Sequence, residues 1–486
     1  MKITLLLGSG RLQKLFSAIK QRFRGAVAPS APPVHTEAPS IPSVSAPASK
    51  PPITAPLPPL PPRERTIVIG VDFGTSTTKV MWQDLSDNHF EAFQWQDAPG
   101  SLLLPSTITL RSGHVYFGIP ESGVREGDVW LHSIKLCVLC RRKPSICRCR
   151  NAAAQSGMIR VPWLAEANPA SSFACLFLGY IFREVERGLA VRFPHDNLVL
   201  IWNIGCPMDH LDVGDRRTEW ERMAGTAMTL RAKLSNPADG ALIVEATDLM
   251  RTIAIAHPDE RNFFIQPEGL AAVKAFLESP HAESKTYAIV DVGAGTTEVS
   301  FFFNGRIMTE PGQPLRPSYL ADSTEAIGGG KIDLELAAAL GCGVDEARRR
   351  KEGGIATCPR LPTIDEICLQ YQRTCGDVVR ERKLVAPSDK RFDLFVIGGG
   401  GRLSVLKGAL PGTVLLGGFA RERSLQLRPP KSLKDRVRLE ADFDFLANAC
   451  GLASSLDWEY YPPSEVSGIA ALPTKERRDV EEFYPK

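Results

Sequence analysis

Apolar runs rich in valine and isoleucine end in glycine-rich turns at three places along the chain. They are IVIGVDFGTSTTK from Ile67, AIVDVGAGTTEVSFF from Ala288 and LFVIGGGGRLSVL from Leu394. Runs that are apolar at nearly every position predict strands buried on both faces of a sheet. In the first two an aspartate stands at the strand end, and such a turn points backbone N–H groups and hydroxyls toward a phosphate. One segment of this kind is common, whereas three in this order indicate phosphate binding.

The folded body begins near Arg65 and alternates strand-like with helix-like runs. NLVLIWNIG from Asn197 predicts a buried strand, and SSFACLFLGYIFREVERGLAVRF from Ser171 predicts a helix that is apolar for most of its length. Alternation of this kind is typical of α/β layers. We therefore expect an α/β fold.

The N-terminal part differs in composition from this body. In residues 1–27, apolar side chains recur at helical spacing with basic residues on the other faces, which predicts a basic amphipathic helix. Residues 28–64 are mostly Pro, Ala, Ser and Thr and predict a disordered linker. We expect the helix to contact an anionic membrane surface or an acidic groove on another protein, the alternative being that it folds back onto the body.

Composition narrows the class of protein. The 486 residues are 43% hydrophobic and 23% charged, as in soluble globular proteins, and a net charge of +3 is too small to indicate a nucleic-acid surface. We find no run of roughly 18 apolar residues that could span a membrane, and the first residues do not resemble a secretory signal. Eleven cysteines without an export signal indicate a cytoplasmic protein with mostly free thiols.

The two aspartates imply a clamp for a phosphorylated ligand. Asp72 and Asp291 at facing strand ends can hold a hydrated Mg²⁺, which prefers few protein ligands plus water and phosphate oxygens. Donors on the two sides are supplied by Gly74, Thr75, Ser76 and Thr77, and by Gly293, Gly295, Thr296 and Thr297. The third turn, from Gly398 to Gly401, opens a helix and would approach a sugar or α-phosphate. The alternative is three tight turns with no ligand.

At this point the chain resembles the actin, sugar-kinase and heat-shock-chaperone ATPase superfamily, with the three turns as its two phosphate motifs and its adenosine motif. It is most similar to the ATPase domain of the seventy-kilodalton, DnaK-type chaperones. That closer resemblance rests on five segments. They are SIKL with Lys135, NIGCPMD around Pro207 with the following RRTEWERMAGTAM, FIQPEGLAAV from Phe264, AIGGGKID ending at Asp333 and DEARRRKEGG from Asp345.

The resemblance implies a two-lobed actin-like ATPase fold, made of duplicated ribonuclease-H-like lobes with a nucleotide cleft between them. It places the first lobe at residues 65–280, with a cysteine-rich insertion at 137–149, and the second at 281–440. Residues 441–486 would form a closing helix and a C-terminal tail. No length remains for a chaperone's peptide-binding domain, so we expect other surfaces to reach a client or partner.

The resemblance also implies roles for single residues. Asp72 and Asp291 would organise magnesium and the attacking water, and Lys135 would stabilise charge on the γ-phosphate of ATP. The place of the family's connecting glutamate is taken by Gln266, with Glu268 two residues on; an amide cannot act as a carboxylate, so we expect slow hydrolysis. The remaining contacts to ATP or ADP would come from Gly328, Gly329, Arg349, Arg350, Lys351, Gly398, Gly399, Gly400 and Arg402.

Three function classes remain open. The one that we favour is a DnaK-like ATPase that couples ATP hydrolysis to lobe closure and regulates a protein partner or client. The second is an actin-like filament or scaffold ATPase, and the third is a small-molecule kinase. Lys135 and the connecting segment favour the first two, which sedimentation with ATP would separate.

A cysteine cluster lies outside this family pattern. Cys137, Cys140, Cys147 and Cys149 form a C-x2-C-x6-C-x-C spacing on a turn-rich basic segment. Four thiolates can hold Zn²⁺ in tetrahedral geometry, and the basic residues would offset their charge. Free thiols and a redox pair are the alternatives.

Overall fold

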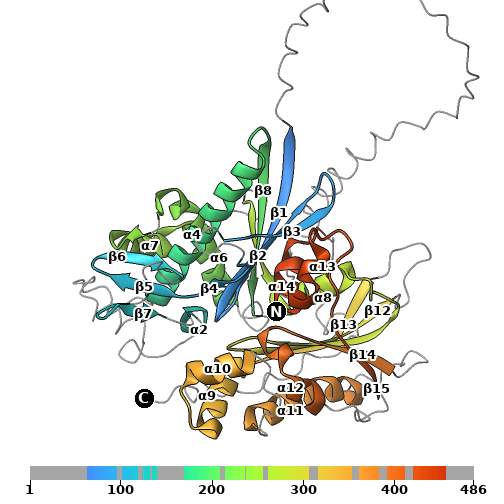
Figure 1. Cartoon of the computed structure of the whole chain (residues 1–486). Helices are drawn as coiled ribbons and strands as arrows, with labels where there is room; N and C mark the ends of the chain where they lie inside the picture. The colour runs from blue at the N-terminus through green and yellow to red at the C-terminus, as the bar shows by residue number, and fades with distance from the viewer. Residues whose placement is uncertain are drawn as a thin grey trace, which may run out of the picture.

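The structure is a computed structural model of the chain (Figure 1). It describes residues 63–95, 101–118, 123, 125–131, 134–138, 169–207, 214–235, 237–255, 261–305, 316–352, 361–381, 391–410 and 420–455. The predicted N-terminal helix, the linker, the end of the C-terminal tail and most of the cysteine cluster lie outside these residues.

The first lobe is built on a mixed sheet with the strand order β10-β8-β1-β2-β3. Its strands are β1 (Glu64–Phe73), β2 (Thr77–Asp84), β3 (His89–Ala92), β8 (Asn197–Cys206) and β10 (Phe263–Pro267), with the short β4 (Leu104–Pro105) paired to β2. The first three strands are antiparallel, and β8 and β10 continue the sheet in parallel with β1. The strand predicted from Asn197 is β8.

The second lobe repeats this topology. Its strands are β11 (Lys285–Val292), β12 (Thr297–Gly305), β13 (Arg316–Glu325), β14 (Arg391–Ile397) and β15 (Ala420–Leu425), in the order β13-β12-β11-β14-β15. Again the first three strands are antiparallel and the last two are parallel to the first. Two copies of one ribonuclease-H-like sheet confirm the prediction of a two-lobed, actin-like α/β fold.

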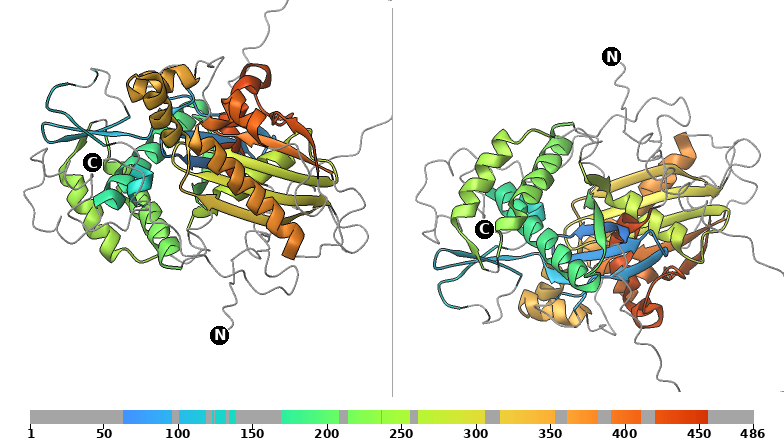
Figure 2. Two further views of the ribbon diagram at one scale, coloured as in Figure 1. Left: turned by 90° about the horizontal axis from the view of Figure 1, so that it is seen from below. Right: turned by 90° about the horizontal axis from the view of Figure 1, so that it is seen from above.

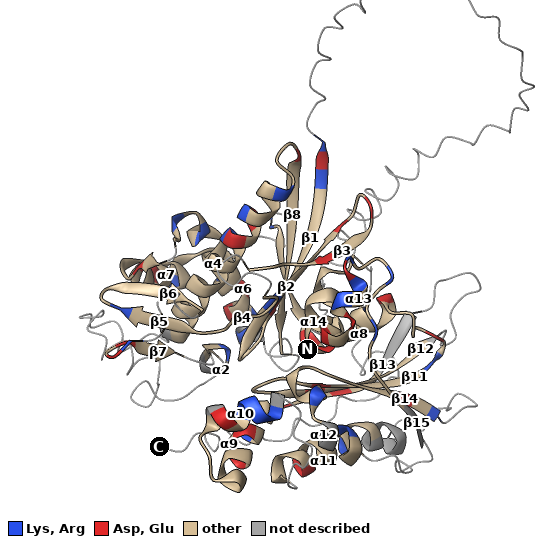
Figure 3. Ribbon diagram, viewed as in Figure 1, with Lys and Arg blue, Asp and Glu red and all other residues tan. Residues whose placement is uncertain are grey.

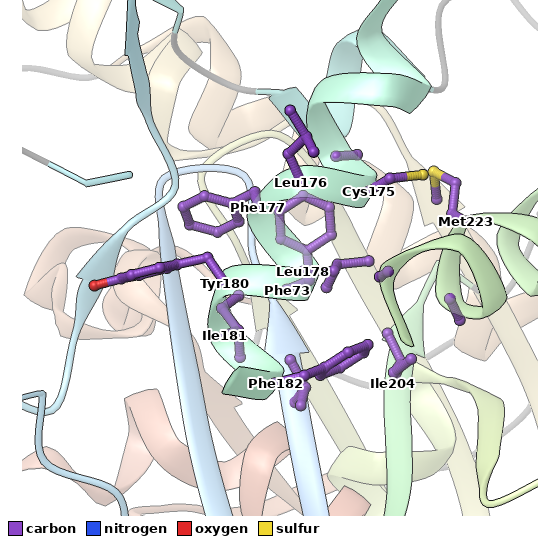
Figure 4. Packing of buried hydrophobic residues seen from close by; sticks show 14 of the residues in the cluster. Phe73, Cys175, Leu176, Phe177, Leu178, Tyr180, Ile181, Phe182, Ile204 and Met223 are labelled. Carbon is purple, nitrogen blue, oxygen red and sulfur yellow. The ribbon is translucent and has the colours of Figure 1, made fainter. Parts of the chain in front are cut away.

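Helices cover the outer faces of both sheets. On the first lobe these are α4 (Pro169–Arg192), α6 (Gly214–Leu230), η3 (Arg231–Lys233) and α7 (Ala241–Thr252). The predicted apolar helix is α4, whose aromatic side chains pack against Phe73 of β1 and Ile204 of β8 (Figure 4). On the second lobe they are α9 (Gly329–Leu340), α10 (Val344–Glu352), α11 (Pro362–Glu381), η4 (Gly399–Arg402) and α12 (Ser404–Ala409); α11 lies across the strands in Figure 2.

A small sheet extends the first lobe. It consists of β5 (Ile108–Arg111), β6 (His114–Phe117), β7 (Val129–Leu131) and β9 (Ala238–Asp239), and the short helix α2 (Ile134–Val138) follows it. Because α2 follows β7 after only a few residues, this sheet fixes where the segment with Lys135 begins.

Two helices lie between the sheets and exchange lobes. Helix α8 (Glu268–Glu278) leaves the first sheet and packs with the second, whereas α14 (Phe443–Ala453), preceded by α13 (Arg436–Leu439) and η5 (Glu440–Asp442), leaves the second sheet and packs on β1 and β2. Both inner sheet faces and both helices share one apolar core. At the crossing, a Cβ on Gly451 would overlap the carbonyl oxygen of Ala271, so only glycine permits this approach.

No helix within the described part of the chain is both long and apolar enough to cross a membrane.

Candidate nucleotide-binding site

The first turn holds its aspartate in an ion pair. Asp72 is the penultimate residue of β1 and is 4% exposed, and Lys79 Nζ lies 2.9 Å from its Oδ2. The two residues face each other directly across the β1–β2 hairpin. A side chain at Gly74 would overlap the carbonyl oxygen of Thr77, so the turn can close this tightly only with glycine.

The second aspartate occupies the equivalent place in the other lobe. Asp291 is the penultimate residue of β11, and Asn448 Nδ2 of α14 donates to its Oδ2 at 2.6 Å. Its Oδ1 lies against Gly398 (φ 77°), where any Cβ would overlap it, so the third glycine turn meets the second one here. Burial and the nearby charge of Asp72 raise the pKa of Asp291, although Asn448 and two lysines oppose the shift.

A buried ion pair lies beside these aspartates. Lys135 of α2 contacts Glu268, the first residue of α8, and the two side chains are 4% and 7% exposed. Burial alone would lower the pKa of Lys135, but the charges of Glu268, Asp72 and Glu298 raise it more, so the lysine stays protonated. Burial raises the pKa of Glu268, as do Asp72 and Asp291, while Lys135 opposes the shift.

The charges of this cluster fit a divalent cation. Four carboxylates (Asp72, Glu268, Asp291 and Glu298) interact with two ammonium groups (Lys79 and Lys135), which leaves an excess of two negative charges when all are ionised. The described residues contain no group of three or more carboxylates, imidazoles or thiolates placed to coordinate a metal ion directly. A magnesium ion at Asp72 and Asp291 would therefore be held through water and phosphate oxygens, which suits its coordination chemistry.

The connecting segment differs from the prediction. Gln266 lies in β10 and accepts a hydrogen bond from Lys274 at 3.2 Å rather than joining the cluster. Glu268 supplies the carboxylate beside Lys135 instead. The connecting segment thus carries a buried carboxylate beside Lys135, and slow hydrolysis stays a prediction.

The glycines before α9 pack against the second turn. The N–H groups of Gly329 and Gly330 donate to the carbonyls of Gly293 and Ala294 at 2.8 and 2.7 Å, and a Cβ at Gly328 would lie 2.7 Å from Ala294. Gly328 and Gly329 thus support the turn through the backbone. Thr297 also differs from the prediction, since its buried hydroxyl donates to the carbonyl of Ile327 at 2.6 Å and is already used within the protein.

The basic residues predicted to line the adenine are placed differently from one another. Arg349 and Arg350 are exposed on α10 and pair with Glu346 of the same helix, which carries both acidic and basic residues (Figure 3). Lys351 turns inward, 2.5 Å from Asp333 and 3.2 Å from the carbonyl of Gly329. Lys351 therefore contacts the glycine segment before α9, whereas Arg349 and Arg350 pair with Glu346.

The third turn carries Arg402 at its end. Its guanidinium lies 4.1 Å above the ring of Phe445 and pairs with Asp442, so it is held against the start of α14. Gly399 lies near the same ring, and Gly400 is packed so closely on Val292 that a side chain would overlap it. The third turn is thus fixed between β11 and α14.

Two residues of the cluster were missed from the sequence. Lys79 stands seven positions after Asp72, and Glu298 stands seven positions after Asp291. Equal spacing in two hairpins could have revealed that both face the aspartates. No local pattern marks Asn448, because its contact joins positions far apart in the chain.

Most of the predicted zinc site lies outside the described residues. Cys140, Cys147 and Cys149 lie outside the described residues, as does the side chain of Cys137. In the part that is described, Cys175, Cys375 and Cys450 are buried free thiols, and burial raises the pKa of each.

No protein-family model and no curated protein matches the sequence. Among solved structures, the fold is similar to one described as the MamK double helical filament, with 13% identity, a TM-score of 0.43 and coverage of 80% of this chain and 98% of that one. A similarity this low indicates nothing about function, and the placement in the two-lobed actin-like class stands on the two repeated sheets. The closer resemblance to the heat-shock chaperones gains no support from these comparisons.

Proposed function

We propose that this chain is an actin-like, magnesium-dependent ATPase that binds ATP or ADP between its lobes. The observation that carries the proposal is the meeting of Asp72 and Asp291, from equivalent strand ends of two repeated sheets, beside the buried pair of Lys135 and Glu268. Tight turns alone would not require one buried lysine, one half-buried lysine and four carboxylates in one place, because unpaired buried charge is costly.

The residues divide the chemistry between them. Asp72 and Asp291 would hold hydrated magnesium, which when bound would neutralise charge on the phosphates. Lys79 and Lys135 are the nearby cations for the transferred phosphoryl group, and positioning and electrostatics supply most of the catalysis of this reaction. Glu268 fixes Lys135 and orients the attacking water, the role expected of the family's connecting glutamate.

The crossing of helices α8 and α14 suggests that ATP hydrolysis controls the arrangement of the two lobes. Helix α8 begins at Glu268, and α14 carries the contact to Asp291, so both touch the site while each packs on the opposite lobe. A change at the phosphates would thereby alter how the lobes close. We propose that lobe closure regulates association with a protein, either other copies of this chain, as in an actin-like filament or scaffold, or a client, as in a DnaK-like protein.

Nucleotide binding and turnover test the proposal. Asp291→Asn should weaken Mg²⁺-dependent ATP binding or abolish hydrolysis measured without any small-molecule acceptor. Asp393→Asn is the matched control, because Asp393 is a buried aspartate of the same sheet that pairs with Lys285 at 3.2 Å. If Asp291→Asn and the parent bind and turn over ATP alike, the assignment is wrong.

Sedimentation separates the two kinds of association. Pelleting of the purified chain with ATP and Mg²⁺, and not with EDTA, would indicate self-assembly. A chain that hydrolyses ATP but stays in the supernatant at all concentrations would favour a separate partner. Hydrolysis that requires an added sugar or other small acceptor would instead indicate a kinase.

A further inference from the structure

Asn448 joins the second aspartate to a helix that belongs to the other lobe. The asparagine is 8% exposed in α14, and its Nδ2 lies 2.6 Å from Asp291 Oδ2. The opposite assignment of the amide would place two oxygens together, so Nδ2 must face the carboxylate. A hydrogen bond from an amide to an ionised carboxylate is among the stronger kinds in proteins.

The same carboxylate is confined on its other side. Asp291 Oδ1 lies against the backbone of Gly398, and the N–H of Gly398 donates to the carbonyl of Asp444 in α14 at 3.0 Å. Helix α14 therefore sets both neighbours of the carboxylate, one directly through Asn448 and one through the third turn.

Helix α14 is in turn anchored in the first lobe. Asn203 Nδ2 of β8 donates to the carbonyl of Leu452 at 2.7 Å, and a Cβ on Gly70 of β1 would overlap the carbonyl of Ala449. This fit leaves α14 no room to slide on the first sheet. Through Asn448, the orientation of Asp291 thus depends on how the second sheet sits relative to the first lobe.

One atom of Asn448 is unexplained by the protein alone. Its Oδ1 is buried and has no hydrogen-bond partner among the described residues. Leaving a buried acceptor unpaired is costly, and such atoms are rare unless a function or an ordered water accounts for them. The atom belongs to the amide that touches Asp291, so a water molecule of a hydrated cation at that carboxylate is a suitable donor.

We propose that Asn448 is a positioning residue for magnesium: it fixes the carboxylate of Asp291, accepts a hydrogen bond from a metal-bound water, and links the metal to the lobe arrangement through α14. This inference rests on the proposed function, since it assigns a role at the same site. It adds a residue on the last described helix to the machinery that responds to Mg²⁺-nucleotide.

The test compares two buried asparagines that hold the same helix. Asn448→Ala removes the contact to Asp291, and Asn203→Ala removes the contact to Leu452 without touching the site. The binding of a fluorescent ADP analogue is titrated with Mg²⁺ and repeated in EDTA, and melting temperatures are recorded for both variants. Asn448→Leu, which keeps the branched shape and the number of heavy atoms but no polar group, serves if the alanine variant does not fold.

The Asn448 variants should need roughly tenfold more Mg²⁺ for half-maximal enhancement of ADP binding, the size expected of a lost hydrogen bond to a charged group. Their ADP affinity in EDTA should match the parent. Asn203→Ala should lower the melting temperature but leave the Mg²⁺ requirement unchanged. If the Asn448 variants and the parent have the same Mg²⁺ requirement, this inference is wrong while the proposed function stands; if the parent itself binds no nucleotide, both are wrong.

Discussion

Replacing Lys135 with methionine would leave Glu268 buried without its cation. Glu268 is 6% exposed, and its neighbours Asp72 and Asp291 are also negative. Without Lys135, the negative charge of Glu268 would therefore be buried without a cation beside it. Removing one partner of a buried ion pair lowers the free energy of unfolding by about 3–5 kcal/mol, whereas an exposed ion pair contributes about 1 kcal/mol or less. We therefore expect Lys135→Met to lower the free energy of unfolding by about 3 kcal/mol at neutral pH.

Acid should relieve part of this loss. Without Lys135 the pKa of Glu268 in the folded protein lies further above its value in the unfolded chain, so the folded state binds the proton more tightly. Stability of the variant relative to the parent should then fall as pH rises from about 4.5 through the raised pKa of Glu268. The double variant Lys135→Met/Glu268→Gln should recover about 1–3 kcal/mol, because neither charge remains.

Urea unfolding followed by circular dichroism measures these differences. Lys331→Met is the matched control, since Lys331 pairs with Glu366 at 2.7 Å on a half-exposed surface. It should change stability by less than about 1 kcal/mol. A cost for Lys135→Met no larger than this control would refute the buried pair. If the pair is real, the variant should also bind nucleotide yet lose most ATP turnover.

Two further substitutions test the helix between the lobes. Burial raises the pKa of Asp444 from 3.8 to about 6, so Asp444→Asn should increase stability at pH 7 by at most about 3 kcal/mol. Because the folded-state pKa is the higher one, the parent loses this stability as pH rises from about 4 to 6, and equal stability of the two proteins at pH 7 in urea unfolding would contradict the assignment. Gly451→Ala should lower the melting temperature severely or prevent folding, because its Cβ would overlap the carbonyl of Ala271. Gly343→Ala, where open space surrounds the added atom, should leave the melting temperature nearly unchanged, and similar values for the two alanine variants would be evidence against the tight crossing.

The sequence allowed us to predict those parts of the site whose residues are consecutive in the chain. Asp72 and Asp291 were found because each strand, its aspartate and its glycine turn are consecutive, and the repeated sheets follow from the same two segments. Glu268 and Gln266 were harder to separate. The end of β10 and the start of α8 decide which of them reaches Lys135, and a two-residue difference cannot be read from similarity alone.

Contacts between distant parts of the chain could not be predicted. Asn448 meets Asp291 only because α14 crosses α8, and that crossing depends on Gly451 and Ala271, which carry no chemical signal in the sequence. The hydroxyl of Thr297 was misjudged for a similar reason. Its acceptor, the carbonyl of Ile327, is brought beside it by the packing of α9 on the second turn.

The exchange of α8 and α14 has a consequence for how the chain is made. The inner face of the first sheet, with Met81 and Phe90, is covered by a helix that ends at Ala453, close to the last described residue. The ribosome must therefore synthesise nearly all of the folded body before α14 can cover the apolar inner face of the first sheet. The two lobes cannot mature one after the other as independent units. We therefore expect α14 to pack late, and until it does the first sheet exposes an apolar surface that is prone to aggregation.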